Sequence, residues 1–210
     1  MRVILVNGSP HQTGATYTAL DEIRKTLEQE GIEAEIFQIG TNPIASCRGC
    51  ASCIKQGKCV IDDDGKVNEF LELAKQADGF VFGTPTHFDG PYGNLVSFMN
   101  RVFYVGCVRS HKLFRLKPIA AIAVARRSGT TSAFAQLYKF FIEMIVVASR
   151  FNSCAFGNDA EEVKQDKEGL NNMRIIGKNM AYVLKCKSIA AEAGLLPPPQ
   201  EEGISTNFIR

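Results

Sequence analysis

The 210-residue sequence has no tryptophan, and its longest apolar runs fall short of the roughly 18 residues that a membrane-spanning helix needs. It also has little net charge, because 24 lysines and arginines face 22 aspartates and glutamates, which leaves +2. A concentrated basic patch is missing, so we expect neither a nucleic-acid nor a membrane partner. The first residues lack the apolar core and small-residue cleavage site of a secretion signal, and we therefore expect a cytoplasmic protein.

The composition is that of an ordinary globular chain, with 45% hydrophobic and 22% charged residues. This excludes a disordered chain, a collagen-like repeat and a disulfide-stabilised miniprotein. Seven cysteines are present, an odd number. In a reducing compartment they are thiols, metal ligands or core residues rather than disulfides.

Short apolar segments alternate with amphipathic ones along the chain. The buried strands that this pattern predicts are Arg2–Asn7, Ala34–Ile39, Gly79–Thr84, Pro118–Ala125 and a fifth within Val146–Phe156. The predicted helices are Thr16–Glu30, Val67–Ala77, Asn94–Val105, Thr131–Ile142 and Asp166–Ala193. Strands that alternate with helices predict an α/β fold, a doubly wound parallel sheet in a three-layer α/β/α arrangement. Ligands bind such sheets at the carboxyl ends of the strands.

The domain organisation that we expect is simple. Residues 1–195 form one domain, into which a cysteine-rich loop at 41–65 is inserted. Residues 196–210 are a proline-rich tail that lies across a surface or a partner subunit, where Phe208 and Ile209 could belong to an exchanged arm.

The loop after the first strand, GSPHQTGAT, is suited to a phosphate. Its small residues let backbone N–H groups approach a ligand, Ser9, Thr13 and Thr16 add hydroxyls, and the following helix start contributes partial positive charge. The spacing fits neither a Walker A loop nor the dinucleotide pattern G-x-G-x-x-G. A phosphate monoester bound without Mg²⁺ is one interpretation, and an ordinary strand-to-helix turn capped by Thr16 is the other.

Two further loops follow the third and fourth strands and meet the first loop at the same sheet edge. The loop TPTHFDG could hold a planar heteroaromatic ring against Phe88, although His87 taken alone fits a surface histidine, or one that supports the site from behind, better than a ring contact. The loop RRSGTT could face that ring or the phosphates of an incoming dinucleotide with Arg126 and Arg127, or simply expose both arginines to solvent.

The runs VNGSPHQTGATYTAL and ADGFVFGTPTHFDGPYGNLVSFMNR resemble the NADPH-dependent FMN reductase family, and the similarity extends over nearly the whole chain. The resemblance implies a flavodoxin-like fold with five parallel strands in the order 2-1-3-4-5, and FMN bound without a covalent link. Many members of the family carry SPVYF where this chain has TPTHF, so the ring contact usual for tyrosine falls to His87.

The same resemblance implies the cofactor contacts residue by residue. For the FMN phosphate they are Ser9, Gln12, Gly14, Ala15 and Thr16. For the isoalloxazine ring they are Pro85, Thr86, His87 and Phe88, with Arg126, Arg127 and Gly129 on the third side.

Four cysteines, Cys47, Cys50, Cys53 and Cys59, are clustered as C-x₂-C-x₂-C-x₅-C. Three thiolates at this spacing can hold one face of a [4Fe-4S] cluster and a fourth can close it, and the pattern resembles the motif of the iron–sulfur flavoproteins, a branch of the same family. Zinc sites usually pair C-x₂-C units at longer separation. Free thiols in a loop beside the flavin are the alternative.

The remaining cysteines and an aspartate run are predicted to have structural rather than functional roles. Cys107, Cys154 and Cys186 stand alone on apolar segments, which favours burial in the core. Asp62, Asp63 and Asp64 fit a solvated loop, with Asp64 capping the next helix, better than they fit a metal site.

The function that follows is an FMN-dependent oxidoreductase that takes hydride from NAD(P)H and passes electrons to a small acceptor: a flavin, a quinone, a nitro or azo compound, or a metal oxyanion. No catalytic side chain is expected, because the flavin carries the chemistry. The alternative is a flavin electron-transfer protein, with or without a cluster, that a protein partner such as ferredoxin reduces. The family also implies a homodimer or homotetramer.

Overall fold

The computed structural model describes residues 1–61, 63, 66–107, 112–150, 153–201, 204, 206 and 208. A parallel sheet lies at its centre, in the order β2-β1-β3-β5-β6. Its main strands are β1 (Arg2–Asn7), β2 (Glu33–Gln38), β3 (Gly79–His87) and β5 (Pro118–Ala125). β6 (Ile145–Val146) pairs with the start of β5, and β7 (Cys154–Phe156) pairs with its end. The predicted order is confirmed, with β6 and β7 as two short pieces in place of one fifth strand.

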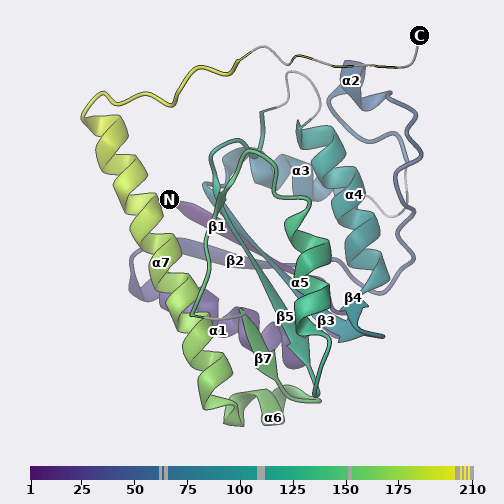
Figure 1. Cartoon of the computed structure of the whole chain (residues 1–210), viewed down its shortest axis with the longest axis vertical. Helices are drawn as coiled ribbons and strands as arrows, with labels where there is room; N and C mark the ends of the chain where they lie inside the picture. The colour runs from purple at the N-terminus through teal and green to yellow at the C-terminus, as the bar shows by residue number, and fades with distance from the viewer. Residues whose placement is uncertain are drawn as a thin grey trace.

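Helices cover both faces of the sheet (Figure 1). On one face lie α1 (Ala15–Gln29) and α7 (Lys167–Glu192), with the short α6 (Ala160–Gln165) between them in sequence. On the other lie α3 (Lys66–Gln76), α4 (Gly93–Cys107) and α5 (Thr130–Tyr138). A short α2 (Cys53–Gln56) lies within the cysteine-rich loop.

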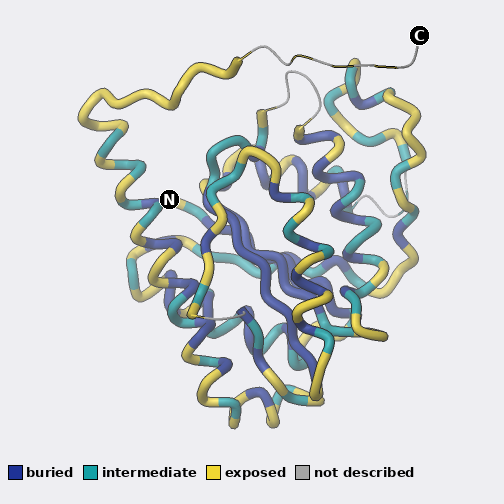
Figure 2. The backbone as a smooth tube through the Cα atoms, viewed as in Figure 1, coloured by how far each residue is buried: buried dark blue, intermediate teal, exposed yellow. Residues whose placement is uncertain are grey.

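The side chains of β1 show why the sheet needs cover on both sides. Val3 and Leu5 pack into the core with α1 and α7, whereas Ile4 and Val6 pack into the core with α3 and α4. Successive side chains of a strand point to opposite faces, so a strand apolar at every position must be covered twice. Figure 2 shows the result as a buried central layer between partly exposed helices.

Apart from the divided fifth strand, the structure departs from the predicted elements in β3, in α5 and in two additional short helices. β3 runs on to His87 and forms a hairpin with β4 (Gly90–Pro91), so part of the predicted loop is strand. α5 ends at Tyr138 rather than Ile142, and α2 and α6 are additional. Asp64, the predicted cap of α3, lies outside the described residues.

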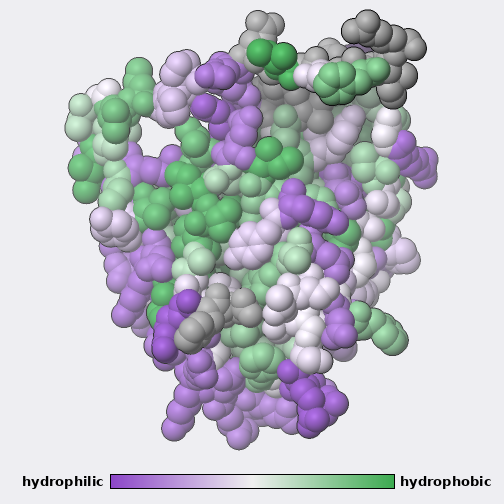
Figure 3. Space-filling view, in the orientation of Figure 1, coloured by the Kyte–Doolittle hydropathy of each residue, from purple (hydrophilic) through white to green (hydrophobic). Residues whose placement is uncertain are grey.

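The chain beyond α7 runs across the amino-end side of the sheet (Figure 1), where the Pro198 carbonyl accepts a hydrogen bond from Arg115 at 2.9 Å. Leu195 and Leu196 are largely exposed there, as is Phe208. A groove of about 630 Å³ lies beneath Leu195–Pro198, between α7 and the amino ends of the strands, and Figure 3 shows apolar residues gathered on this side below the tail. The suggested exchanged arm stays a prediction, and its Ile209 lies outside the described residues. Within the part of the chain that the structure describes, no helix is both long and apolar enough to cross a membrane.

Candidate functional site

A cavity of about 460 Å³ lies at the carboxyl ends of β1, β3 and β5. This is where the sheet order reverses, because β1 is followed by β2 on one side and β3 on the other. The volume is within the range of about 300–1,000 Å³ typical of ligand pockets. Its lining residues are Ser9, His11, Gly14, Ala15, Thr16, Pro85, Thr86, His87, Val124, Ala125, Arg126, Gly157, Asn158 and Asp159.

The loop after β1 is held in place by Asn7, which is fully buried. Its Oδ1 accepts a hydrogen bond from the Ser9 backbone N–H at 3.1 Å, and its Nδ2 donates to the His11 carbonyl at 3.2 Å. Gln38, at the end of β2, donates from Nε2 to the Ser9 carbonyl at 2.7 Å. The loop is therefore fixed before any ligand enters, and neither amide was among the predicted site residues. The sequence held one signal for Asn7, because it is a polar residue at the end of the apolar run of β1.

Two glycines let this loop come close to its surroundings. The Gly8 N–H donates to the Gly83 carbonyl at 2.8 Å, and a Cβ at Gly8 would lie 2.6 Å from that same oxygen. Gly14 precedes α1 and supplies no side-chain cap. The first N–H groups of a helix have no partner within the helix, so those of Ala15 and Thr16 are available to an anion.

Two buried hydroxyls beside the cavity have no hydrogen-bond partner among the described residues: Oγ1 of Thr16 and Oγ1 of Thr86. Thr16 is only 1% exposed. An unpaired buried hydroxyl costs about 1–3 kcal/mol, so it indicates a polar ligand whose atoms would complete it. One hydroxyl is at the start of α1 and the other at the end of β3, which fits a ligand with a phosphate at one end and a polar ring at the other.

Most of the residues predicted from the resemblance line this cavity: Ser9, Gly14, Ala15, Thr16, Pro85, Thr86, His87 and Arg126. The other four, which the structure also describes, are Gln12, Phe88, Arg127 and Gly129, and they are not among its lining residues. The cavity also takes in His11, Val124, Ala125 and the segment Gly157–Asp159, which sequence reasoning missed. That segment follows β7, a strand whose exact place the sequence did not give.

Phe88 and Gly129 have clear places outside the cavity. Phe88 is at the tip of the β3–β4 hairpin and is fully exposed. Gly129 has φ +92° at the start of α5, and a Cβ there would lie 2.6 Å from Thr86 Cγ2. Glycine at this position therefore lets α5 begin directly against the strand end that carries Thr86.

All four clustered cysteines line a second cavity, which is much smaller and is shared with residues of α4. Cys53 is buried, which raises its pKa, whereas hydrogen bonds from Ser52 lower the pKa of the exposed Cys50. The four thiols fit the donor set of an iron–sulfur cluster. The cavity measures about 20 Å³, so the loop would have to open around a cluster. In the described residues, His, Cys, Asp and Glu side chains form no group of three close enough to hold a metal ion as they stand.

Residues 45–63 are tied to α4 by Arg101, which is 1% exposed. Its Nε donates to Cys59 Sγ at 3.2 Å, and its terminal nitrogens contact the Asp63 carboxylate and donate to the Ile61 carbonyl at 2.5 Å. Arg101 was not predicted to take part in any site. Its signal was a lone cation in the middle of an apolar helix.

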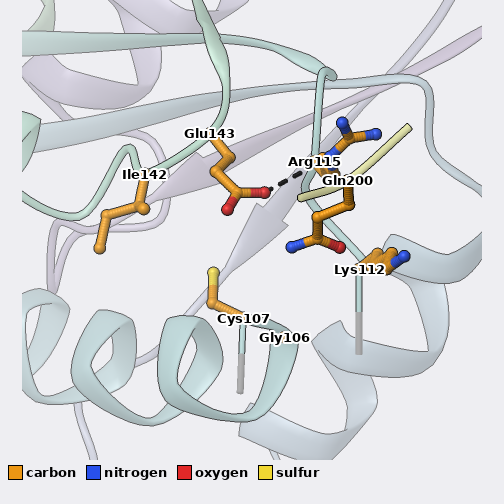
Figure 4. Close-up of a pocket in the computed structure, with 7 residues that line it drawn as sticks. All are labelled: Gly106, Cys107, Lys112, Arg115, Ile142, Glu143 and Gln200. Atoms are coloured by element: carbon orange, nitrogen blue, oxygen red, sulfur yellow. Dashed lines mark ion pairs between the residues drawn. The ribbon is translucent and has the colours of Figure 1, made fainter. Parts of the chain in front are cut away.

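The prediction of core burial is wrong for two of the other three cysteines, because Cys107 and Cys186 are exposed residues while Cys154 is half-buried. The Cys107 sulfur nevertheless points into a small cavity of its own, beside an Arg115–Glu143 ion pair of 3.5 Å (Figure 4). Burial of this thiol, with the Glu143 charge nearby, raises its pKa to about 11.

Comparison with known proteins places this architecture in a family. An iron–sulfur flavoprotein of Methanocaldococcus jannaschii is 31% identical over 194 residues, which covers 88% of this chain and 98% of that protein. Among solved structures, RosB with its bound intermediate 8-demethyl-8-formylriboflavin-5'-phosphate is 14% identical, with a TM-score of 0.67 over 100% of this chain and 92% of the other. An NAD(P)H:quinone oxidoreductase from Methanothermobacter marburgensis is 15% identical, with a TM-score of 0.63 over 86% and 96% of the two chains. At these identities the two structures show the flavodoxin-like fold alone. Residues 1–159 match the family described as NADPH-dependent FMN reductase, and the chain belongs to that family.

Proposed function

We propose that this chain is an FMN-dependent oxidoreductase that takes hydride from NAD(P)H and passes electrons to a small acceptor, and that its four clustered cysteines hold an iron–sulfur cluster. The observation that carries the flavin site is the pair of unpartnered buried hydroxyls, Thr16 and Thr86, in a cavity of ligand size at the carboxyl edge of the sheet. Flavins, quinones, nitro or azo compounds and metal oxyanions are the acceptor classes.

The residues of the cavity divide into two groups. The N–H groups of Ala15 and Thr16, with the Thr16 hydroxyl, would hold the phosphate by charge-assisted hydrogen bonds. Pro85, Thr86 and His87 would hold the ring. When bound, FMN accepts a hydride and releases the electrons again. The protein therefore has to bind the ring, orient it and leave one side of it accessible. The exposed rim of His11, His87 and Arg126 leaves such access.

The cluster would be held by the thiolates of Cys47, Cys50, Cys53 and Cys59, which all line one cavity. The name of the M. jannaschii relative, an iron–sulfur flavoprotein, supports this assignment. A bound cluster would carry single electrons. Figure 1 shows α2, which begins at Cys53, near the end of α4 that lies opposite β4, whereas Thr86 and His87 of the proposed flavin site pair with β4.

One observation favours a second function, an electron-transfer protein that a ferredoxin-like partner reduces. Arg48, Lys55 and Lys58 are exposed around the cysteines, and this basic surface suits an acidic carrier. The two functions differ in the electron donor.

The experiment that separates them is anaerobic stopped-flow reduction of the FMN-loaded protein by NADPH, by NADH and by reduced ferredoxin. The proposal predicts rapid flavin bleaching by at least one nicotinamide. Reversing charge at Lys55 and Lys58 (Lys55→Glu with Lys58→Glu) should leave that rate unchanged. If only ferredoxin reduces the flavin, and the double variant but not Lys167→Glu slows it, the chain is a carrier. Lys167 is an exposed control at the start of α7.

A further inference from the structure

Arg101 is a buried cation whose side-chain hydrogen bonds, within the described residues, go to the cysteine-rich loop. It belongs to α4 and is 1% exposed, whereas arginines are almost never fully buried without partners. Removing a guanidinium from water costs several kcal/mol unless hydrogen bonds replace the lost hydration. Its hydrogen-bond partners therefore have to replace that hydration, and their positions show which part of the chain Arg101 holds.

Its contacts join the two ends of the segment that contains the four cysteines. At the amino-terminal end of the segment, before Cys47, Arg101 donates to the Ala45 carbonyl at 3.3 Å. At the carboxyl-terminal end, after Cys59, the same side chain donates to the Ile61 carbonyl at 2.5 Å and to the Asp63 carboxylate. Asp63 Oδ2 also accepts a hydrogen bond from the Ala45 N–H at 2.9 Å, which closes residues 45–63 into a ring.

Cys59 is the cysteine that this network fixes most firmly. Arg101 Nε donates to its sulfur at 3.2 Å. Asn68 of α3 holds its backbone twice, accepting from the Cys59 N–H and donating to the Cys59 carbonyl, both at 2.9 Å. By contrast, Cys50 is exposed on the outer part of the loop.

From these contacts we infer that Arg101 is a positioning residue for the cluster: it fixes Cys59 as the fourth ligand and donates a hydrogen bond to the ligating sulfur. The inference rests on the proposed cluster. Hydrogen bonds to cluster sulfurs are among the factors that set its reduction potential, because they stabilise the more negative, reduced state. Arg101 therefore makes the cluster easier to reduce.

The test is an anaerobic redox titration of the holoprotein with dithionite and mediators, which follows cluster and flavin in one sample. Arg101→Lys keeps the charge but loses the Nε–H donor to Cys59. We expect it to retain iron and FMN, and its cluster potential to become more negative, with the equilibrium constant for reduction about tenfold lower. The flavin potential should not change.

Asp63→Asn is the matched control, since it disturbs the same network without touching the Arg101–Cys59 contact. Loss of a nearby negative charge should leave the cluster potential unchanged or make it less negative, opposite in sign to the effect of Arg101→Lys. A purely structural role for the network would make both variants alike, and that result would contradict the inference.

The other outcomes are also decisive. If Arg101→Lys loses iron but keeps FMN and the wild-type melting temperature, the positioning of Cys59 is supported. If both variants lose iron and FMN together, or if Arg101→Lys titrates at the wild-type potential, the inference is overturned while the proposed function stands. A wild-type protein that takes up no iron overturns the cluster assignment and this inference with it.

Discussion

Asn7 donates a hydrogen bond from Nδ2 to Oε1 of Gln38 at 2.5 Å, and this pair joins the carboxyl ends of β1 and β2 beneath the loop that follows β1. Each amide also bonds the loop itself: Asn7 through the Ser9 N–H and Gln38 through the Ser9 carbonyl. The cavity wall is therefore anchored by two side chains that lie outside its lining.

Replacing Asn7 by aspartate should destabilise the flavin-free protein by about 2–4 kcal/mol, because a buried carboxylate would face the His11 carbonyl with no donor to offer. Urea unfolding measures the loss. Asn179→Asp is the control: its amide makes one exposed bond to the Ala148 carbonyl and should change stability by less than about 0.5 kcal/mol. Equal effects at the two positions would show that the Asn7 network does not hold the loop.

Replacing Thr16 by valine should weaken FMN binding by about tenfold to a hundredfold, since a hydrogen bond to a charged group contributes about 1.5–3 kcal/mol. Thr26→Val on the same helix is the matched control, because Thr26 is equally buried but its hydroxyl already bonds the Glu22 carbonyl at 2.8 Å. Fluorescence titration of the apoprotein with FMN gives both affinities. Equal affinities would remove Thr16 from the phosphate site.

Phe88 and Asp89 both have positive φ, +47° and +56°, at the turn of the β3–β4 hairpin. Phe88→Gly should raise the free energy of unfolding by about 0.5–1 kcal/mol, because glycine adopts this conformation without the steric cost of a Cβ. Since Phe88 lies outside the cavity, FMN affinity should not change. A large loss of affinity would instead support the sequence prediction that the ring packs on Phe88.

The Cys107 thiol, with a pKa of about 11, should alkylate slowly at neutral pH and about tenfold faster with each pH unit up to that value, because only the thiolate reacts. The unfolded chain loses this proton at lower pH than the folded one. Deprotonation of Cys107 in the unfolded chain therefore lowers the free energy of unfolding as the pH rises from 9.0 to about 11. Peptide mass spectrometry after iodoacetamide pulses measures the rate. Glu143→Gln should accelerate labelling at pH 9, and a rate independent of pH would contradict the assignment.

Local sequence signals predicted most of the fold. Continuous apolar segments such as Val3–Val6 and Ile119–Val124 must be buried on both faces, which identifies parallel strands and the edge where ligands bind. The edge strand was harder: β6 and β7 hold two and three residues and exist because they pair with opposite ends of β5. Such short strands have no periodicity of their own.

The candidate site likewise contains residues that the sequence predicted and residues that it did not. Segments at the carboxyl ends of strands could be assigned to the cavity from sequence, as with Ser9–Thr16 after β1 and Pro85–His87 at the end of β3. Contacts between distant segments could not, because Gln38 lies 29 residues from Ser9 and Arg101 lies 42 from Cys59. Pairings of this kind are set by the packing of whole elements rather than by local pattern.

The central claim is that the cavity at the strand ends binds FMN, which NAD(P)H reduces, and that the four cysteines hold an iron–sulfur cluster. The most direct test is the anaerobic visible spectrum of the purified protein before and after NADPH, with FMN and iron analysis of the same sample. The account predicts flavin bands that bleach on addition of NADPH, over a broad cluster absorption accompanied by iron. A colourless protein that cannot be loaded with FMN would contradict it.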